Sequence, residues 1–247
     1  MIRSRLGLKT LGMCALVLGL MAVWVGAAQA EETGGSWTYE IGGLLKTFEG
    51  ALHEPSVNGA LEAGTEAVLH AKVLGGTEIL YECTAVSIVG GRLQLGGDIK
   101  GSLVFSGCRT LLNGVLSNNC KPKAGGTEEG VIKTVPILAL MLLHKLIEGG
   151  VKDRILIAHP QEGTNFAFIE STAACAIGLK VAIGGLLAFQ DPAPTTHLVN
   201  HLIKEFLPLN DLYVISKTPE HKAHCLSSAI LFLTGEHLNY KWAGLWL

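Results

Sequence analysis

The sequence has little charge and few aromatic side chains, and it contains no run of basic residues. Only 16% of its 247 residues are charged and 6% are aromatic, and the formal net charge is −2. Proteins that bind nucleic acids present a basic patch or stripe to the phosphates, so we expect no nucleic-acid partner. In contrast, 49% of the residues are hydrophobic, which is enough apolar material for a buried core.

The common sequence signatures of catalytic and cofactor sites are also missing. There is no Gly-x-Ser-x-Gly elbow, which serine hydrolases use to expose their nucleophile, and no Gly-Lys-Ser/Thr end of a phosphate-binding loop. No Cys-x-x-Cys pair is present either, and structural zinc sites commonly use that spacing. We therefore expect no cofactor, and no catalytic residue is assigned from the sequence.

The first 30 residues have the three parts of a secretory signal peptide. Basic residues near the start carry no compensating acid, residues 11–25 are apolar and uncharged, and Ala-Gln-Ala at 28–30 offers a small-x-small cleavage site. An uncleaved membrane anchor is disfavoured, because this apolar run is shorter than the ~20 residues that span a bilayer. A lipoprotein would need Cys14 as its acylated residue, and that cysteine lies inside the apolar run.

This pattern predicts cleavage after Ala30 and one exported domain over residues 31–247. The most apolar later run, residues 135–143, is interrupted by Pro136 and is too short for a transmembrane helix. We therefore expect no membrane-spanning segment in the mature chain. Its predicted location is secreted or in the cell envelope.

Short β-forming runs separated by turn residues indicate a mainly β fold. Residues 66–74 and 77–89 are rich in β-formers, and Gly75-Gly76 between them is typical of a hairpin turn. About ten such runs predict an antiparallel β-sandwich or a barrel-like sandwich. One segment differs, because apolar residues recur at helical spacing over residues 196–207 before Pro208; this predicts one short helix.

Histidine provides the best candidate for chemistry. On the predicted helix, His197 and His201 would share one face, and His221, His224 and Cys225 follow in a short cluster. Imidazoles one helical turn apart can chelate a metal ion. However, the metalloprotease motif needs Glu directly after the first His, and here Leu198 is present. Surface histidines beside a loop explain the same residues.

Short motifs spread over most of the mature chain resemble a family of uncharacterised exported bacterial proteins that is common in actinobacteria. They include Cys83-Thr-Ala-Val, Phe105-Ser-Gly-Cys108, Leu112-Asn-Gly-Val, Cys120-Lys-Pro and Cys175-Ala-Ile-Gly178. The resemblance implies a secreted β-rich domain with cysteines at the positions of Cys83, Cys108, Cys120 and Cys175. No established activity or ligand of the family can be carried over to residues of this chain.

Export permits disulfides, and five cysteines remain after the predicted cleavage. Spacing alone leaves every arrangement of two bridges and one free thiol open. The turn-rich segment between Cys108 and Cys120 favours a bridge between these two, and Cys83–Cys175 then follows by elimination. Cys225 lies outside the four-cysteine pattern of the resembled family. We predict that it is unpaired and packed in a buried strand.

Two functions of different classes follow. The leading hypothesis is a non-enzymatic extracellular or envelope-associated protein with a binding or structural role. Trp242 and Trp246 could form a binding patch for a partner outside the cell, although a closing strand that seals the core explains them as well. The alternative is a metal-dependent hydrolase that uses His197, His201, His221 and His224.

Overall fold

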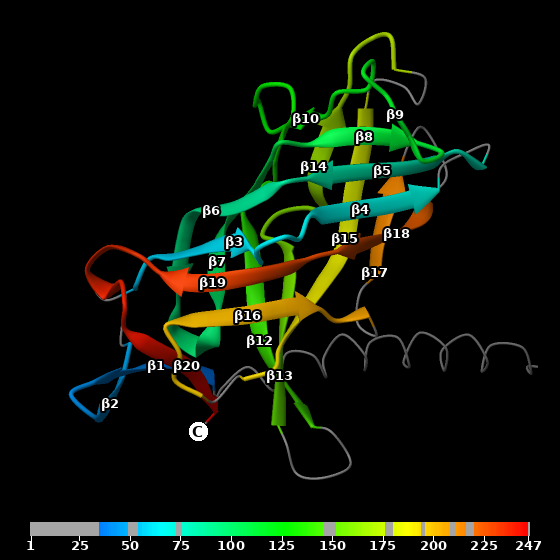
Figure 1. Cartoon of the computed structure of the whole chain (residues 1–247). Helices are drawn as coiled ribbons and strands as arrows, with labels where there is room; N and C mark the ends of the chain where they lie inside the picture. Colours follow the sequence, from blue (N-terminus) through cyan, green and yellow to red (C-terminus); the bar gives the residue numbers. More distant parts are fainter. Residues whose placement is uncertain are drawn as a thin grey trace, which may run out of the picture. The chain divides into compact units, whose positions relative to one another are not determined.

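Antiparallel β-strands dominate the computed structural model of the chain (Figure 1). The predicted mainly β fold is confirmed, and the described helical segments are short 3-10 turns such as η3 (Leu95–Gly97) and η5 (Gly235–His237). No helix within the described residues is long and apolar enough to cross a membrane. The expected signal peptide lies outside the described residues, which are 35–48, 54–72, 76–145, 152–175, 180–193, 196–207, 211–215 and 220–246.

Most of the strands combine into eight long strands, because consecutive strands often continue each other across a bend or a short interruption. Only β15 (Lys180–Asp191) is one element over its whole length. The others are β3 (Val57–Leu61) with β4 (Ala67–Lys72), β5 (Glu78–Cys83) with β6 (Ala85–Leu93), β7 (Ile99–Ser106) with β8 (Arg109–Leu112), β11 (Val131–Lys133) with β12 (Ile137–Lys145), β13 (Lys152–Pro160) with β14 (Asn165–Glu170), β16 (Asn200–Glu205) with β17 (Asp211–Ile215), and β18 (Glu220–Leu226) with β19 (Ser228–Leu233).

These eight long strands form a closed antiparallel circuit in chain order. Each has an antiparallel ladder with the next one along the chain, and the last returns to the first, because β18 pairs with β4 and β19 pairs with β3. A bridge between Ser56 and Arg92 adds a contact between β3 and β6. In Figure 1, β4, β5, β16 and β19 run across the front, whereas β12, β13 and β15 run steeply behind them. The fold is therefore a barrel-like sandwich.

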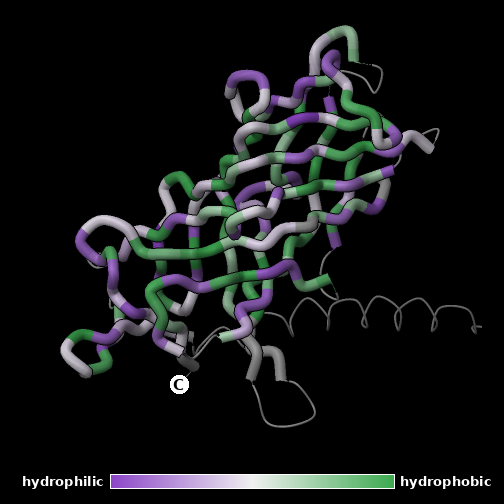
Figure 2. The backbone as a smooth tube through the Cα atoms, in the orientation of Figure 1, coloured by the Kyte–Doolittle hydropathy of each residue, from purple (hydrophilic) through white to green (hydrophobic). Residues whose placement is uncertain are grey.

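The inner side of the circuit is apolar. In β5, the alternate residues Ile79, Tyr81 and Cys83 are buried, and β19 shows the same alternation with Leu231 and Leu233 buried. Figure 2 shows hydrophobic and hydrophilic residues alternating along many strands. A period of two sends successive side chains to opposite faces of a strand, so the core lies inside the circuit.

A small separate sheet carries the aromatic residues near the two ends of the described chain. It has the order β2 (Leu44–Thr47), β1 (Gly35–Ile41) and β20 (Lys241–Trp246). Trp242 is 1% exposed, lies 5.2 Å from the ring of Trp37, and donates its ring N–H to the Val199 carbonyl. This position agrees with a closing strand rather than a binding patch for Trp242.

The predicted helix over residues 196–207 is wrong, because residues 200–205 form strand β16. The strand lies between two others: it pairs with β19 from Asn200 to Lys204 and with β15 near its end. A helix here would leave both neighbours with unpaired backbone groups. Closure of the circuit therefore overrides the helical spacing of the apolar residues.

The predicted cysteine pairing is also wrong, although all four of the expected cysteines are in disulfides. The bonds are Cys83–Cys108 and Cys120–Cys175. Because β5 pairs with β8, the end of β5 and the residue before β8 come together, and the two Cα atoms of the first pair lie 4.0 Å apart. The turn-rich segment instead folds into a hairpin between β8 and β9 (Val115–Leu116), where Asn113 has a positive φ.

Peptide mapping without reduction should recover fragments that join Cys83 to Cys108 and Cys120 to Cys175. Replacing Cys120 and Cys175 by Ala together should lower the free energy of unfolding by about 4 kcal/mol, because a 55-residue separation is no longer closed in the unfolded chain. Denaturant titration measures this loss. A fragment joining Cys108 to Cys120 would contradict the observed pairing.

Candidate functional site

The four predicted histidines do not form one site in the described structure. His201 is buried at 2% exposure, His197 is half-buried before β16, and His224 is exposed on β18, opposite His70 of β4. The side chain of His221 lies outside the described residues. Among the residues that the structure describes, no three His, Cys, Asp or Glu side chains are placed to hold a metal ion. Residues 200–205 are extended, so the shared helical face on which the metal hypothesis rested is absent.

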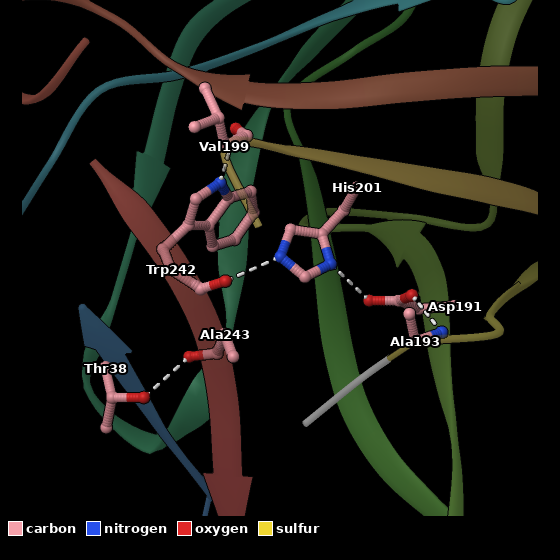
Figure 3. Close-up of polar contacts among 7 residues, drawn as sticks. All are labelled: Thr38, Asp191, Ala193, Val199, His201, Trp242 and Ala243. Carbon is pink, nitrogen blue, oxygen red and sulfur yellow. Dashed lines mark hydrogen bonds and ion pairs between the residues drawn. The ribbon is translucent and has the colours of Figure 1, made fainter. Parts of the chain in front are cut away.

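His201 instead pairs with the carboxylate of Asp191 inside the circuit, and its contact with Trp242 connects the circuit to the small sheet (Figure 3). Its Nδ1 lies 2.8 Å from Asp191 Oδ2, and its Nε2 lies 2.6 Å from the carbonyl oxygen of Trp242. Both partners are acceptors, so both contacts are hydrogen bonds only when both ring nitrogens carry a hydrogen. Asp191 also accepts from the Ala193 N–H, which holds its carboxylate in place.

His197 is held in a hydrogen-bonded chain next to this pair. Thr38 Oγ1 donates its hydrogen to the Ala243 carbonyl, so it accepts from His197 Nε2 at 3.0 Å. Burial lowers the pKa of His197 from its ordinary value, Glu40 opposes this shift, and the charge of nearby His201 adds to it. The contacts of both histidines serve the attachment of β20.

Replacing His201 by Ala should lower the free energy of unfolding by ~3–5 kcal/mol, because the Asp191 carboxylate stays buried without its partner. Denaturant titration of the single variants and of the double variant His201→Ala/Asp191→Ala measures this coupling. The double variant should lose less than the two single losses added together. Single losses below ~1 kcal/mol would contradict a buried ion pair.

Three small cavities lie within the circuit, and they form the most site-like feature of the molecule. Their volumes are about 80, 50 and 60 Å³. Leu103 of β7 lines all three, so one side chain lies between neighbouring cavities. The largest is lined by Ala67, Val68, Leu69, Tyr81, Cys83, Leu103, Phe105, Ile132, Thr134, Phe166, Ala167, Ile169, Ile183, Leu187, Leu212 and Cys225.

Few polar groups occur in the wall of the largest cavity, and one of them lacks a partner. Thr134 Oγ1 accepts the Leu103 N–H at 2.9 Å. The Tyr81 hydroxyl is buried and has no hydrogen-bond partner among the described residues. Burial raises the pKa of Tyr81 well above its ordinary value, so the hydroxyl stays neutral. An unpaired buried hydroxyl costs about 1–3 kcal/mol, which makes it an unusual feature for a native core.

Tyr81→Phe should leave the free energy of unfolding unchanged or raise it by ~1 kcal/mol, because the substitution removes a buried hydroxyl that makes no hydrogen bond. Denaturant titration measures the change. The control is Thr134→Val, which removes a hydroxyl that does accept a hydrogen bond and should destabilise the protein. A loss above ~1 kcal/mol for Tyr81→Phe would mean that its hydroxyl has a partner.

Cys225 is free and buried, as predicted, and lines two of the cavities. The pKa of its thiol is raised to about 12, chiefly by burial and also by the charge of Glu205, while a hydrogen bond with Ser227 opposes the shift. The thiolate is the nucleophilic form of cysteine, so this residue is unreactive at neutral pH.

A thiol reagent should therefore label the native protein far more slowly than the unfolded protein at both pH 7 and pH 9, because the thiol is buried and both values lie far below its folded pKa. Unfolding the mature protein (residues 31–247) without reduction should release one reactive thiol per chain, which mass spectrometry counts. In the Cys225→Ala control, unfolding should release none. Rapid labelling of the native protein would contradict burial of this thiol.

The wall of the circuit has a gap in its strand pairing next to the largest cavity, between β11 and β14, and we call this gap the window. Beyond the ladder of β12 and β13, strands β11 and β14 do not pair with each other in the described structure. The Val135 N–H donates to the Phe166 carbonyl at one end of this gap. At the other end β10 (Lys123–Ala124) is wedged between the two strands: it pairs with β11 in parallel and meets β14 where Lys123 faces Glu170.

A groove of about 460 Å³ covers this window. Thr134 and Ala167 line both the groove and the largest cavity, so only small side chains stand between them. The groove is lined by Lys123, Ala124, Gly125, Gly126, Thr127, Lys133, Thr134, Val135, Ala167, Phe168 and Glu170.

Hydrogen bonds of Thr127, a glycine at position 125 and a disulfide hold the edge of the window in place. Thr127 Oγ1 lies 2.8 Å from the Ala124 carbonyl oxygen and 2.6 Å from that of Val131, which closes the loop after β10. A Cβ on Gly125 would lie 2.9 Å from the Lys133 carbonyl oxygen, so only glycine permits this close approach. The disulfide Cys120–Cys175 then ties the chain before β10 to the chain after β14.

Sequence reasoning missed the cavities and the window. The alternation around Tyr81 could have placed its ring on the same face as Ile79 and Cys83, but it carries no information on whether the hydroxyl finds a partner. The comparisons with protein-family models, curated proteins and solved structures give no match. Inference about function therefore starts from the cavities and the window.

Proposed function

We propose that this chain is an exported, non-enzymatic binding protein that takes a small apolar molecule into the interior of its strand circuit. The observation that carries the proposal is the largest cavity, which has an apolar lining and adjoins a groove across Thr134 and Ala167. Closed antiparallel barrels of about eight strands have an interior that side chains just fill or that holds one small ligand.

The interior of this protein is incompletely filled. Each cavity is smaller than the ~150 Å³ apolar cavity that takes up benzene, but they adjoin one another around Leu103. A rotamer change of Leu103 would join them into a larger apolar space.

Three features support export to an oxidising compartment. The chain has two disulfides, which persist outside the cytosol, and its first 30 residues predict a signal peptide. The resemblance to exported bacterial proteins points the same way. A metal-dependent hydrolase has no comparable support, because His201 is engaged with Asp191 and Trp242, and His224 faces away from the interior.

Binding is tested with 1-decanol, a neutral single-chain probe, by its effect on the melting temperature. A ligand that binds only the folded state raises stability with its concentration, so the melting temperature of the wild type should rise with decanol. No rise at any concentration below the solubility limit would overturn the proposal.

Leu103→Ala locates this binding. The variant should lose about 2–5 kcal/mol of stability without ligand, because the substitution enlarges the interior space. It should also show a larger rise in melting temperature with decanol than the wild type, since the cavities are then joined. The control is Leu116→Ala, at an exposed position on β9, which should leave both quantities unchanged. Equal decanol responses of Leu103→Ala and the wild type would place binding outside the cavities.

A further inference from the structure

We infer that the ligand is an anionic amphiphile, whose carboxylate lies in the groove between β11 and β14 and whose tail enters the cavity through the window. This inference rests on the proposed function and names the chemical class of its ligand. It follows from the charges of the groove, from the continuity between groove and cavity, and from their sizes.

The groove contains two lysines without a carboxylate partner. Lys123 and Lys133 line it, and both are half-buried. Neither forms an ion pair with any residue that the structure describes. Other basic side chains do form such pairs within the described part of the chain: Lys100 with Glu54, Arg109 with Glu66 and Glu82, Lys121 with Glu129, Lys180 with Glu170, and Lys222 with Asp211.

Glu170, the acid that lines the groove, forms no ion pair with either of these lysines. Glu170 faces Lys123 across the β10–β14 bridge, but its carboxylate lies 4.0 Å from the Lys180 ammonium, which also lies over the ring of Phe168. Two ammonium groups that are partly removed from water favour an anion between them. Lysine offers a compact charge with freely rotating donors, and this suits a carboxylate head that arrives in more than one orientation.

Apolar side chains line part of the groove, and the cavity behind it is apolar. Val135, Ala167 and the 43% exposed ring of Phe168 provide apolar surface beside the lysines. The groove volume of about 460 Å³ falls within the ~300–1,000 Å³ range of small-molecule pockets, whereas the cavity of about 80 Å³ accepts only the end of a chain. A single tail of medium length fits this division better than a double-tailed lipid.

The test compares decanoate with 1-decanol by isothermal titration calorimetry, because the two probes share a chain and differ in the charge of the head. The wild type should bind decanoate about tenfold more tightly than decanol. Lys133→Gln and Lys123→Gln should each weaken decanoate binding about fivefold and leave decanol binding unchanged. The matched control Lys222→Gln, at an exposed position on β18, should bind both probes as the wild type does.

A second measurement needs no variant. The affinity of the wild type for decanoate should fall between ~0.05 and 0.5 M salt, because the salt screens partly exposed charges, and the affinity for decanol should not fall. The inference of an anionic head group would be overturned if both probes bound with equal affinity, or if neither salt nor the lysine substitutions weakened decanoate binding. Either result would leave the proposed function standing. Absence of binding by both probes would overturn the proposed function itself.

Discussion

The return of β18 and β19 to β4 and β3 is the constraint on which the rest of the structure depends. It closes an antiparallel circuit in which every long strand has neighbours on both sides, so few backbone groups are left at an open edge. Closure also defines an inside, where one face of every strand must be apolar. The extended state of β16, the burial of Cys225 and the positions of the cavities all follow from it.

Two kinds of bond supplement the strand pairing. The Cys83–Cys108 disulfide lies where β5 bends into β6, and Cys120–Cys175 holds β10 beside β14 at the window. His201, which Asp191 holds in place, contacts the Trp242 carbonyl of β20. The bridge between Leu198 and Trp242 and the hydrogen bond from the Trp242 ring to Val199 join the same strand to the circuit.

The interior combines stability with open space. Cavities and an unpaired Tyr81 hydroxyl both reduce the free energy of unfolding, because they forgo packing and a hydrogen bond. Elsewhere the core is well filled, with Ile79, Leu93 and Trp242 each 1% exposed. Imperfect packing is thus concentrated around Leu103 and beside the window, where the groove lysines lie. This concentration is what a ligand-binding interior requires.

Much of the secondary structure could be predicted from the residues alone, because strands and hairpins depend on local alternation and turn residues. The mainly β fold and the burial of Cys225 follow from patterns a few residues long, whereas the free state of Cys225 was expected from the four-cysteine pattern of the resembled family. Local spacing misled at residues 196–207 and at Cys108 and Cys120, since the strand partners of β16 and of β8 come from distant parts of the chain. The candidate site is likewise built from residues that are far apart in the sequence. Thr134 and Ala167 meet in one wall only after the circuit has closed, and the same is true of Lys123 and Lys133 in the groove. The sequence therefore determined which strand faces are apolar. The tertiary structure alone decided where those faces leave space, because the cavity walls come from strands that are distant in the chain.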